Sequence, residues 1–250
     1  MTTVAPPPSG IAAALAGHGA RFLGEGTPLD RAIGRAAATT AVAAAFPVFE
    51  RVRDVAIGRL NDPLADPAAC EMVAVLAAAA LLGRGSAGLF APSADADRWL
   101  RGGWLEEHVG LSALAAGADE VRIGQKIVWE AGGFHGENEI DTIARFAERL
   151  VFVSAKAFRS RLEGGDARHR ERLMEALHEA DDLIDHFGDA GSVVALVVST
   201  DLWDERRHRP RYEQLYGKAA ALGVALVTLE GLARTTLVGR LRELGAGPRG

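Results

Sequence analysis

The chain has 250 residues, of which 48% are apolar and 24% charged, and its formal net charge is −5. These proportions are ordinary for a globular protein with a sizeable core, and they exclude a globally basic molecule. Any nucleic-acid-binding surface must therefore be local. The single cysteine, Cys70, excludes an internal disulfide framework and a cysteine-based zinc site, and its apolar helical surroundings predict a buried structural thiol.

The first ten residues contain neither a charged segment nor a long apolar one, so no targeting signal is expected. The longest apolar run, residues 72–83, is shorter than the roughly 20 residues that cross a bilayer. We expect a soluble, cytoplasmic protein without a membrane partner.

Residues 1–85 are rich in alanine and leucine, and their apolar spacing predicts helices over residues 11–22, 29–60 and 67–82. Pro47 is expected to end or kink the middle helix. A Gly-rich and Ser-rich stretch, residues 83–97, reads as a linker. The pattern predicts an all-helical N-terminal region (1–85) followed by a second domain (96–250).

From residue 96 the pattern predicts a helix over 98–114 and three consecutive strands over 121–129, 139–146 and 150–157. A long amphipathic helix (166–187), a strand buried on both faces (193–199), a helix (212–222), a strand (224–229) and a closing helix (235–244) follow. This order predicts an α/β fold with a mixed sheet flanked by helices.

Two polar motifs interrupt the predicted strands. Side chains alternate along a strand, so Glu139 and Asp141 share one face, as do Ser154 and Lys156 on the next strand. If these faces coincide, two carboxylates lie beside an ammonium group at one end of an apolar sheet. Such charges are costly to bury unless they are paired or bind a metal.

This arrangement has one structural and one chemical interpretation. A Lys–Asp ion pair across two strands is a common feature of sheets. Alternatively, carboxylates suit hard cations such as Mg²⁺ or Mn²⁺, and a neighbouring lysine stabilises charge on a phosphate. Lys156 is one of only three lysines in an arginine-rich chain, and it lies in an apolar strand. These two facts strengthen the chemical interpretation, although each motif taken alone is more often a surface feature than a functional site.

Asp141, a turn and an apolar strand ending in Lys156 resemble the signature of the PD-(D/E)xK, or restriction-endonuclease-like, nuclease superfamily. With Gly102-Gly103-Trp104-Leu105-Glu106-Glu107 and Asn138-Glu139, they resemble the nuclease domains of CRISPR ancillary effectors that carry an N-terminal CARF sensor. The resemblance covers about residues 98–232. Residues 1–85 lack the alternating strands and helices of a CARF sensor, so no cyclic-oligonucleotide sensor is expected.

The resemblance implies a restriction-endonuclease-like core and a role for each motif. Asp141 would be the central metal ligand and Lys156 the catalytic lysine. One of Glu106 and Glu107, with Glu106 favoured, would be the helix-borne metal ligand, since only one can face the sheet. Ser154 stands where the family has an acidic residue, so Glu139 is the expected substitute.

Two arginine-rich segments are candidates for contacts with phosphates. Arg206, Arg207 and Arg209 form a basic loop after a strand, and Arg168 lies at the start of the long helix. Phosphate contacts dominate nucleic-acid affinity, but nearby acidic residues also permit a purely solvated loop.

These features predict a metal-dependent endonuclease that hydrolyses DNA or RNA in prokaryotic antiviral defence, and they are compatible with a homodimer. An activated water would attack the phosphodiester while Asp141 and an acidic partner hold the metal. Two alternatives remain: a catalytically degenerate domain that binds nucleic acid or a protein without cleaving, and an assembly subunit that uses the fold as a scaffold.

Overall fold

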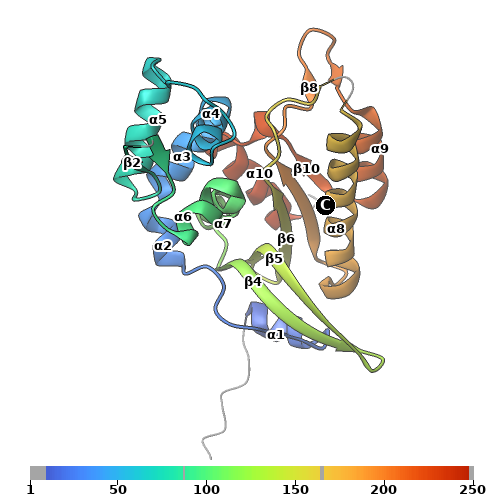
Figure 1. The fold of residues 1–250 in the computed structure, drawn as a ribbon. Coiled ribbons are helices and arrows are strands. Elements are labelled where there is room, and N and C mark those ends of the chain that lie inside the picture. Colours follow the sequence, from blue (N-terminus) through green and yellow to red (C-terminus); the bar gives the residue numbers. More distant parts are fainter. Residues whose placement is uncertain (1–9, 87, 164–165, 248–250) are drawn as a thin grey trace, which may run out of the picture.

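The computed structural model describes residues 10–86, 88–163 and 166–247. Its centre is a six-stranded sheet in the order β1-β4-β5-β6-β7-β10 (Figure 1). The strands of this sheet are β1 (Ala20–Phe22), β4 (Glu120–Ala131), β5 (Phe134–Phe146), β6 (Arg149–Lys156), β7 (Val193–Val198) and β10 (Ala225–Val227). Strands β1, β4, β5 and β6 pair antiparallel, whereas β6, β7 and β10 pair parallel. The predicted α/β fold with a mixed sheet is confirmed.

The three predicted consecutive strands are present as β4, β5 and β6. Gly132 and Gly133 form the two-residue turn between β4 and β5, and both have positive φ. Such a turn matches the twist of the flanking strands. The second turn contains Ala147, also with positive φ, between the paired residues Phe146 and Arg149. The antiparallel order of β4, β5 and β6 therefore follows from two short turns, one formed by glycines and one containing Ala147.

Helices cover both faces of the sheet. On one face lie α8 (Ala167–Phe187), α9 (Glu213–Leu222) and α1 (Ile11–Ala16); on the other lie α7 (Trp104–Ala116) and α10 (Arg234–Ala246). The amphipathic spacing predicted for α8 is confirmed, because Leu173, Leu177 and Leu183 are buried against β6 and β7. Strand β7 is buried on both faces, as its apolar run predicts.

The N-terminal helical region packs onto α7. It contains α2 (Leu29–Gly34), α3 (Ala36–Ala44), α4 (Phe46–Ala56) and α5 (Pro67–Ala78). Pro47 lies in the first turn of α4, so the predicted interruption there is confirmed. Phe46 and Phe49 of α4 contact the Trp104 ring of α7, with centroids 5.2 and 5.8 Å away. These helices therefore share a core with the helix that carries Glu106.

Several local predictions differ from the structure. The helix predicted over 11–22 is wrong beyond Ala16, because Gly17 and Gly19 end it and β1 adds to the edge of β4. The predicted linker (83–97) instead contains the paired strands β2 (Gly83–Gly85) and β3 (Gly88–Phe90) and most of the helix α6 (Ala94–Arg98). Cys70 is exposed, so the predicted burial of its thiol is wrong; it lies on the outer face of α5.

Four short elements complete the description. A π-helical turn, η1 (Trp99–Gly103), leads from α6 into α7. Strands β8 (Trp203–Asp204) and β9 (Arg209–Pro210) form a small hairpin after β7, and a 3-10 turn, η2 (Leu229–Gly231), follows β10. Across the described residues, every helix is too short or too polar to span a membrane.

Candidate active site

The two predicted catalytic strands separate at Asp141. The pairing of β5 with β6 ends at Thr142 and Val153. Beyond this point the backbone N–H of Ala155, which faces the β5 side of β6, makes no hydrogen bond to β5 backbone. Asp141 Oδ2 accepts a hydrogen bond from this N–H at 2.7 Å. The side chain is thereby held between the strands, close to the end of β6.

Lys156, the last residue of β6, lies beside Asp141. Its Nζ is 3.6 Å from Asp141 Oδ2 and 3.2 Å from Glu179 Oε2 on α8. Burial disfavours the ammonium, but the two carboxylates outweigh burial and raise the pKa of Lys156. The lysine therefore stays charged at neutral pH. Its contact with Glu179 is not apparent from the sequence, because Glu179 is one of many acidic residues on the solvated side of α8.

Glu106, in the first turn of α7, faces the same place. Burial, together with the negative charges of Asp141 and Glu139, raises its pKa to about 7 against the opposing effects of Arg98 and Lys156. Burial also raises the pKa of Asp141, and Glu139 adds to this, whereas Lys156 and the Ala155 N–H lower it. Glu139 and Lys156 therefore act electrostatically on both Glu106 and Asp141 at this end of the sheet.

Gly124 of β4 leaves the space into which two of these carboxylates point. Its φ is +56°, and the pairing of β4 with β5 is interrupted between Gly124 and Asp141. A methyl group on Gly124 would lie 3.5 Å from Glu106 Oε2 and 3.9 Å from Glu139 Oε1. Glu139 and Glu106 therefore border one small space.

Glu107 faces a different direction and has partners of its own. It is 3% exposed and accepts hydrogen bonds from Trp99 Nε1 at 2.7 Å and from the Arg35 guanidinium at 3.2 Å. Burial raises its pKa, and these two donors oppose the shift. The helical offset between the two glutamates thus places Glu106 towards the sheet end and Glu107 towards the N-terminal helices.

Ser154, which stands where the PD-(D/E)xK signature has an acidic residue, is 4% exposed and lies between buried neighbours in β6. Among the residues that the structure describes, no group of three His, Cys, Asp or Glu side chains is close enough together to hold a metal ion. The chemistry of the donors nevertheless fits a hard cation, because Glu106, Asp141 and Glu139 offer carboxylate oxygens whose mutual repulsion a cation would relieve.

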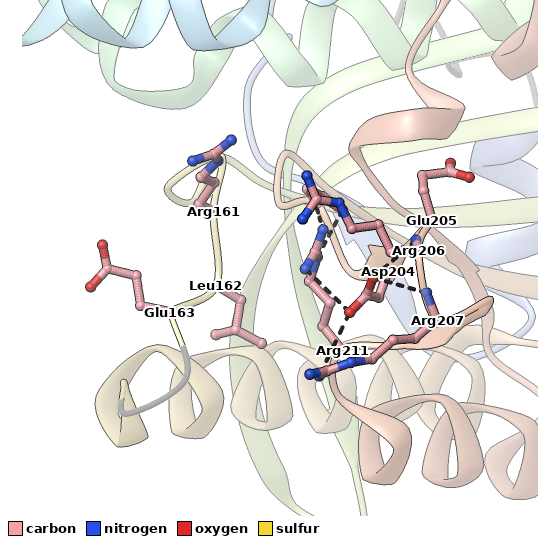
Figure 2. Close-up of a pocket in the computed structure, with 9 residues that line it drawn as sticks. Arg161, Leu162, Glu163, Asp204, Glu205, Arg206, Arg207 and Arg211 are labelled. Carbon is pink, nitrogen blue, oxygen red and sulfur yellow. Dashed lines mark hydrogen bonds and ion pairs between the residues drawn. The ribbon is translucent and has the colours of Figure 1, made fainter.

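The predicted basic loop forms the β8–β9 hairpin and lines a pocket of about 580 Å³ (Figure 2). Most of its arginines are paired. Arg211 lies 3.1 Å from Asp201, Arg207 lies 3.9 Å from Asp204, and Arg209 lies 3.6 Å from Glu213. Asp204 also caps the turn by accepting the backbone N–H groups of Arg206 and Arg207. Neither Asp141 nor Lys156 lines this pocket.

Arg168 lies elsewhere, in the first turn of α8. It borders a separate pocket with Arg159, which closely follows Lys156 in the chain, and with Arg172. The proximity of Arg159 and Arg172 to Arg168 was not predicted. An i, i+4 spacing of Arg168 and Arg172 is visible in the sequence, but their approach to the end of β6 depends on how α8 packs.

No family model matches the chain, and no curated protein matches it. Solved structures share its fold. Protein VC1899 from Vibrio cholerae is similar over 95% of this chain and 62% of its own, with a TM-score of 0.65 and 19% identity. Can2 from Sulfobacillus thermosulfidooxidans, in complex with cyclic tetra-adenylate, is similar over 95% of this chain and 63% of its own, with a TM-score of 0.61 and 14% identity. The chain therefore spans less than two-thirds of either protein, and the shared fold includes the N-terminal helices as well as the sheet.

Proposed function

We propose that this protein is a divalent-metal-dependent nuclease that hydrolyses phosphodiester bonds of DNA or RNA in prokaryotic defence. The observation that carries the proposal is the meeting of Asp141, Lys156 and Glu106, which come from β5, β6 and α7. The sequence resemblance to PD-(D/E)xK nuclease domains assigns these same three residues to the catalytic centre. The fold shared with Can2, a protein that binds cyclic tetra-adenylate, supports the resemblance to CRISPR effectors.

Asp141, Glu106 and Glu139 would hold Mg²⁺ or Mn²⁺. The cation, when bound, would activate water and neutralise charge on the phosphate. The Ala155 N–H fixes the orientation of the Asp141 carboxylate. It thereby leaves the other carboxylate oxygen available as a ligand.

Lys156 supplies a positive charge for the phosphate. Its raised pKa keeps it protonated, and its side chain remains one-third exposed, so a phosphate oxygen can reach it. A charge fixed in a partly buried site stabilises the transition state more than a mobile surface lysine does, because no reorganisation is needed during the reaction. The contact with Glu179 holds the ammonium on the α8 side of Asp141.

The second candidate function is binding of nucleic acid without cleavage. It is favoured by Ser154, which cannot replace the missing carboxylate and is buried within β6. In this case Asp141 and Lys156 would form a structural ion pair only.

Cleavage assays on plasmid DNA, single-stranded DNA and RNA with Mg²⁺ or Mn²⁺ test the proposal. Lys156→Ala should lower the rate by about 100-fold or more, the effect of removing one stabilising charge from a transition state. Lys218→Ala, a change of an exposed lysine on α9, is the matched control and should cleave like the parent. Metal-dependent cleavage that survives Lys156→Ala would disprove the catalytic assignment. Nucleic-acid binding without cleavage by the parent would favour the second candidate.

A further inference from the structure

A second basic pocket lies between the segment that follows β6 and the first turns of α8. Its volume is about 290 Å³, enough for a phosphate group. It is lined by Phe158, Arg159, Asp166, Arg168, His169 and Arg172. We call it the α8 pocket.

The arginines of the α8 pocket differ from those of the β8–β9 hairpin. In the described part of the chain, Arg159, Arg168 and Arg172 form no ion pair, whereas Arg207, Arg209 and Arg211 all do. Arg172 is held in place by the Phe158 ring, with its guanidinium carbon 4.9 Å from the ring centroid. Three guanidinium groups without carboxylate partners around one pocket favour an anion from outside the chain.

His169 provides an independent sign of a ligand. The residue is 7% exposed, and its Nδ1 has no hydrogen-bond partner; the carboxylate oxygen Asp166 Oδ2 is 3.9 Å away. Thr200 Oγ1 donates its single proton to the carbonyl of Arg159, so it accepts a hydrogen bond from His169 Nε2–H. Nδ1 of the neutral ring is then an unpaired acceptor beside the pocket. Binding of a phosphate would allow Nδ1 to take up a proton and donate.

The surroundings of His169 are charged on several sides. Burial lowers the pKa of the imidazole, and Arg172 of α8 and Arg159 lower it further. Asp166, the N-cap of α8, and Glu50 of α4 oppose them. A bound phosphate would cancel the effect of both arginines and so favour the protonated ring.

The α8 pocket and the candidate active site lie along the same helix. Arg172 precedes Glu179, the partner of Lys156, by two helical turns, so both residues are on one side of α8. The rise of an α-helix places them about 10 Å apart along its axis. Three nucleotide steps of duplex span roughly this distance.

We infer that the α8 pocket binds a backbone phosphate of the nucleic-acid substrate, a few nucleotides from the bond next to Lys156. Arg168 and Arg172 contact the phosphate oxygens, Arg159 adds charge at the β6 side, and His169 donates from Nδ1. The inference rests on the proposed nuclease function, but binding is measurable without cleavage.

Binding of fluorescein-labelled single-stranded RNA, single-stranded DNA and duplex DNA in EDTA, followed by anisotropy over a range of KCl concentrations, tests the inference. Arg168→Ala with Arg172→Ala should weaken binding by about tenfold and reduce the salt dependence, with a loss of about 0.7 in slope per single-strand phosphate contact. Arg84→Ala, an exposed arginine on the distant β2–β3 hairpin, is the matched control and should bind like the parent. The Arg168→Lys, Arg172→Lys variant should recover most of the salt slope because it keeps both charges.

Calorimetry with inorganic phosphate separates the two sources of a phosphate group. Weak or no binding of inorganic phosphate, with oligonucleotide affinity that depends on both arginines, supports the inference. Phosphate binding that depends on these arginines, with unchanged oligonucleotide affinity, would overturn it in favour of a free-anion site. An unchanged salt slope would also overturn it. If the parent does not cleave but binding depends on Arg168 and Arg172, the pocket stands and the proposed catalysis fails.

Discussion

The Glu106 carboxyl is half-buried among like charges, and this costs folding free energy at high pH. Its pKa in the folded state, about 7, is above the ordinary value of 4.5. The stability that it contributes is therefore fully present below pH 4.5 and lost as the pH rises through 7. Because the site is partly hydrated, the loss is roughly 1–3 kcal/mol rather than the full value of the shift.

We therefore expect Glu106→Gln to raise the thermal unfolding temperature at pH 8 and to leave it nearly unchanged at pH 4.5. The same variant should lose metal-dependent cleavage. Thermal denaturation at both pH values, in EDTA, measures the first effect without interference from the cation. Equal stabilisation at both pH values would show that the Glu106 carboxyl is not perturbed.

Position 124 requires glycine for two reasons: the backbone conformation there and the limited space beside it. Its φ of +56° is unfavourable for other residues, and an added methyl group would face Glu106 and Glu139. Gly124→Ala should lower the free energy of unfolding by about 1–3 kcal/mol because of the strained backbone. It should also weaken Mn²⁺ binding, measured by calorimetry. Gly217→Ala on α9, where nothing lies within 4 Å, is the control and should do neither.

Helix α7 carries two adjacent glutamates, Glu106 and Glu107, with different structural roles. Glu107 ties the helix to η1 through Trp99 and to the end of α2 through Arg35. Glu107→Ala would leave a buried indole N–H without an acceptor and Arg35 without one of its carboxylates. We expect a loss of about 2–4 kcal/mol in the free energy of unfolding. Urea denaturation measures this loss, and Glu106→Ala, one position away, should not show it. Equal destabilisation by both would contradict the division of roles.

The sequence predicts a helix or strand correctly where a single residue pattern is enough to determine it. The apolar alternation of β5 and β6 and their short turns placed Asp141 and Lys156 close together. The contact of Lys156 with Glu179 depends on the rotation of α8 about its axis, which the apolar positions fix only to within a residue or two. Strand β1 was missed because three residues carry too little pattern, and they form a strand only because the edge of β4 offers hydrogen bonds. The exposed Cys70 shows that an apolar helix can still turn a small residue to solvent.

At the scale of the whole molecule, Glu106 and the buried His108 have opposite effects on how the free energy of unfolding depends on pH, and these effects largely cancel. Burial lowers the pKa of His108 to about 4, and its Nε2 bonds the Leu232 carbonyl beyond η2. The stability associated with neutral His108 is present above pH 6.5 and lost as the pH falls towards 4. Glu106 has the opposite slope over nearly the same range.

Removing either titratable group should therefore reveal the pH dependence that the other group contributes to the free energy of unfolding. Relative to the parent, the free energy of unfolding of Glu106→Gln should rise with pH between about 4.5 and 7, and that of His108→Gln should fall between about 4 and 6.5. Urea denaturation at intervals of half a pH unit measures both slopes. Parallel profiles for the parent and both variants would show that neither group titrates abnormally.

Strand β6 is bonded to an antiparallel neighbour on one side and to a parallel one on the other, and this has a consequence for how the protein becomes active as it folds. The hairpin partner β5 is close in the chain, whereas β7 can pair only after the intervening segment and α8 have crossed over the sheet. Contacts between distant segments form late because their loop entropy must first be overcome. Asp141 and Lys156 thus meet early, while Glu179, Arg168 and Arg172 arrive with α8. Trp129 packs against α8, whereas Trp99 and Trp104 pack against α4. A refolding chain with Trp129→Phe and Trp203→Phe should accordingly recover its tryptophan fluorescence before it recovers the capacity to hold an oligonucleotide, and the interval between the two signals would time the docking of a single helix.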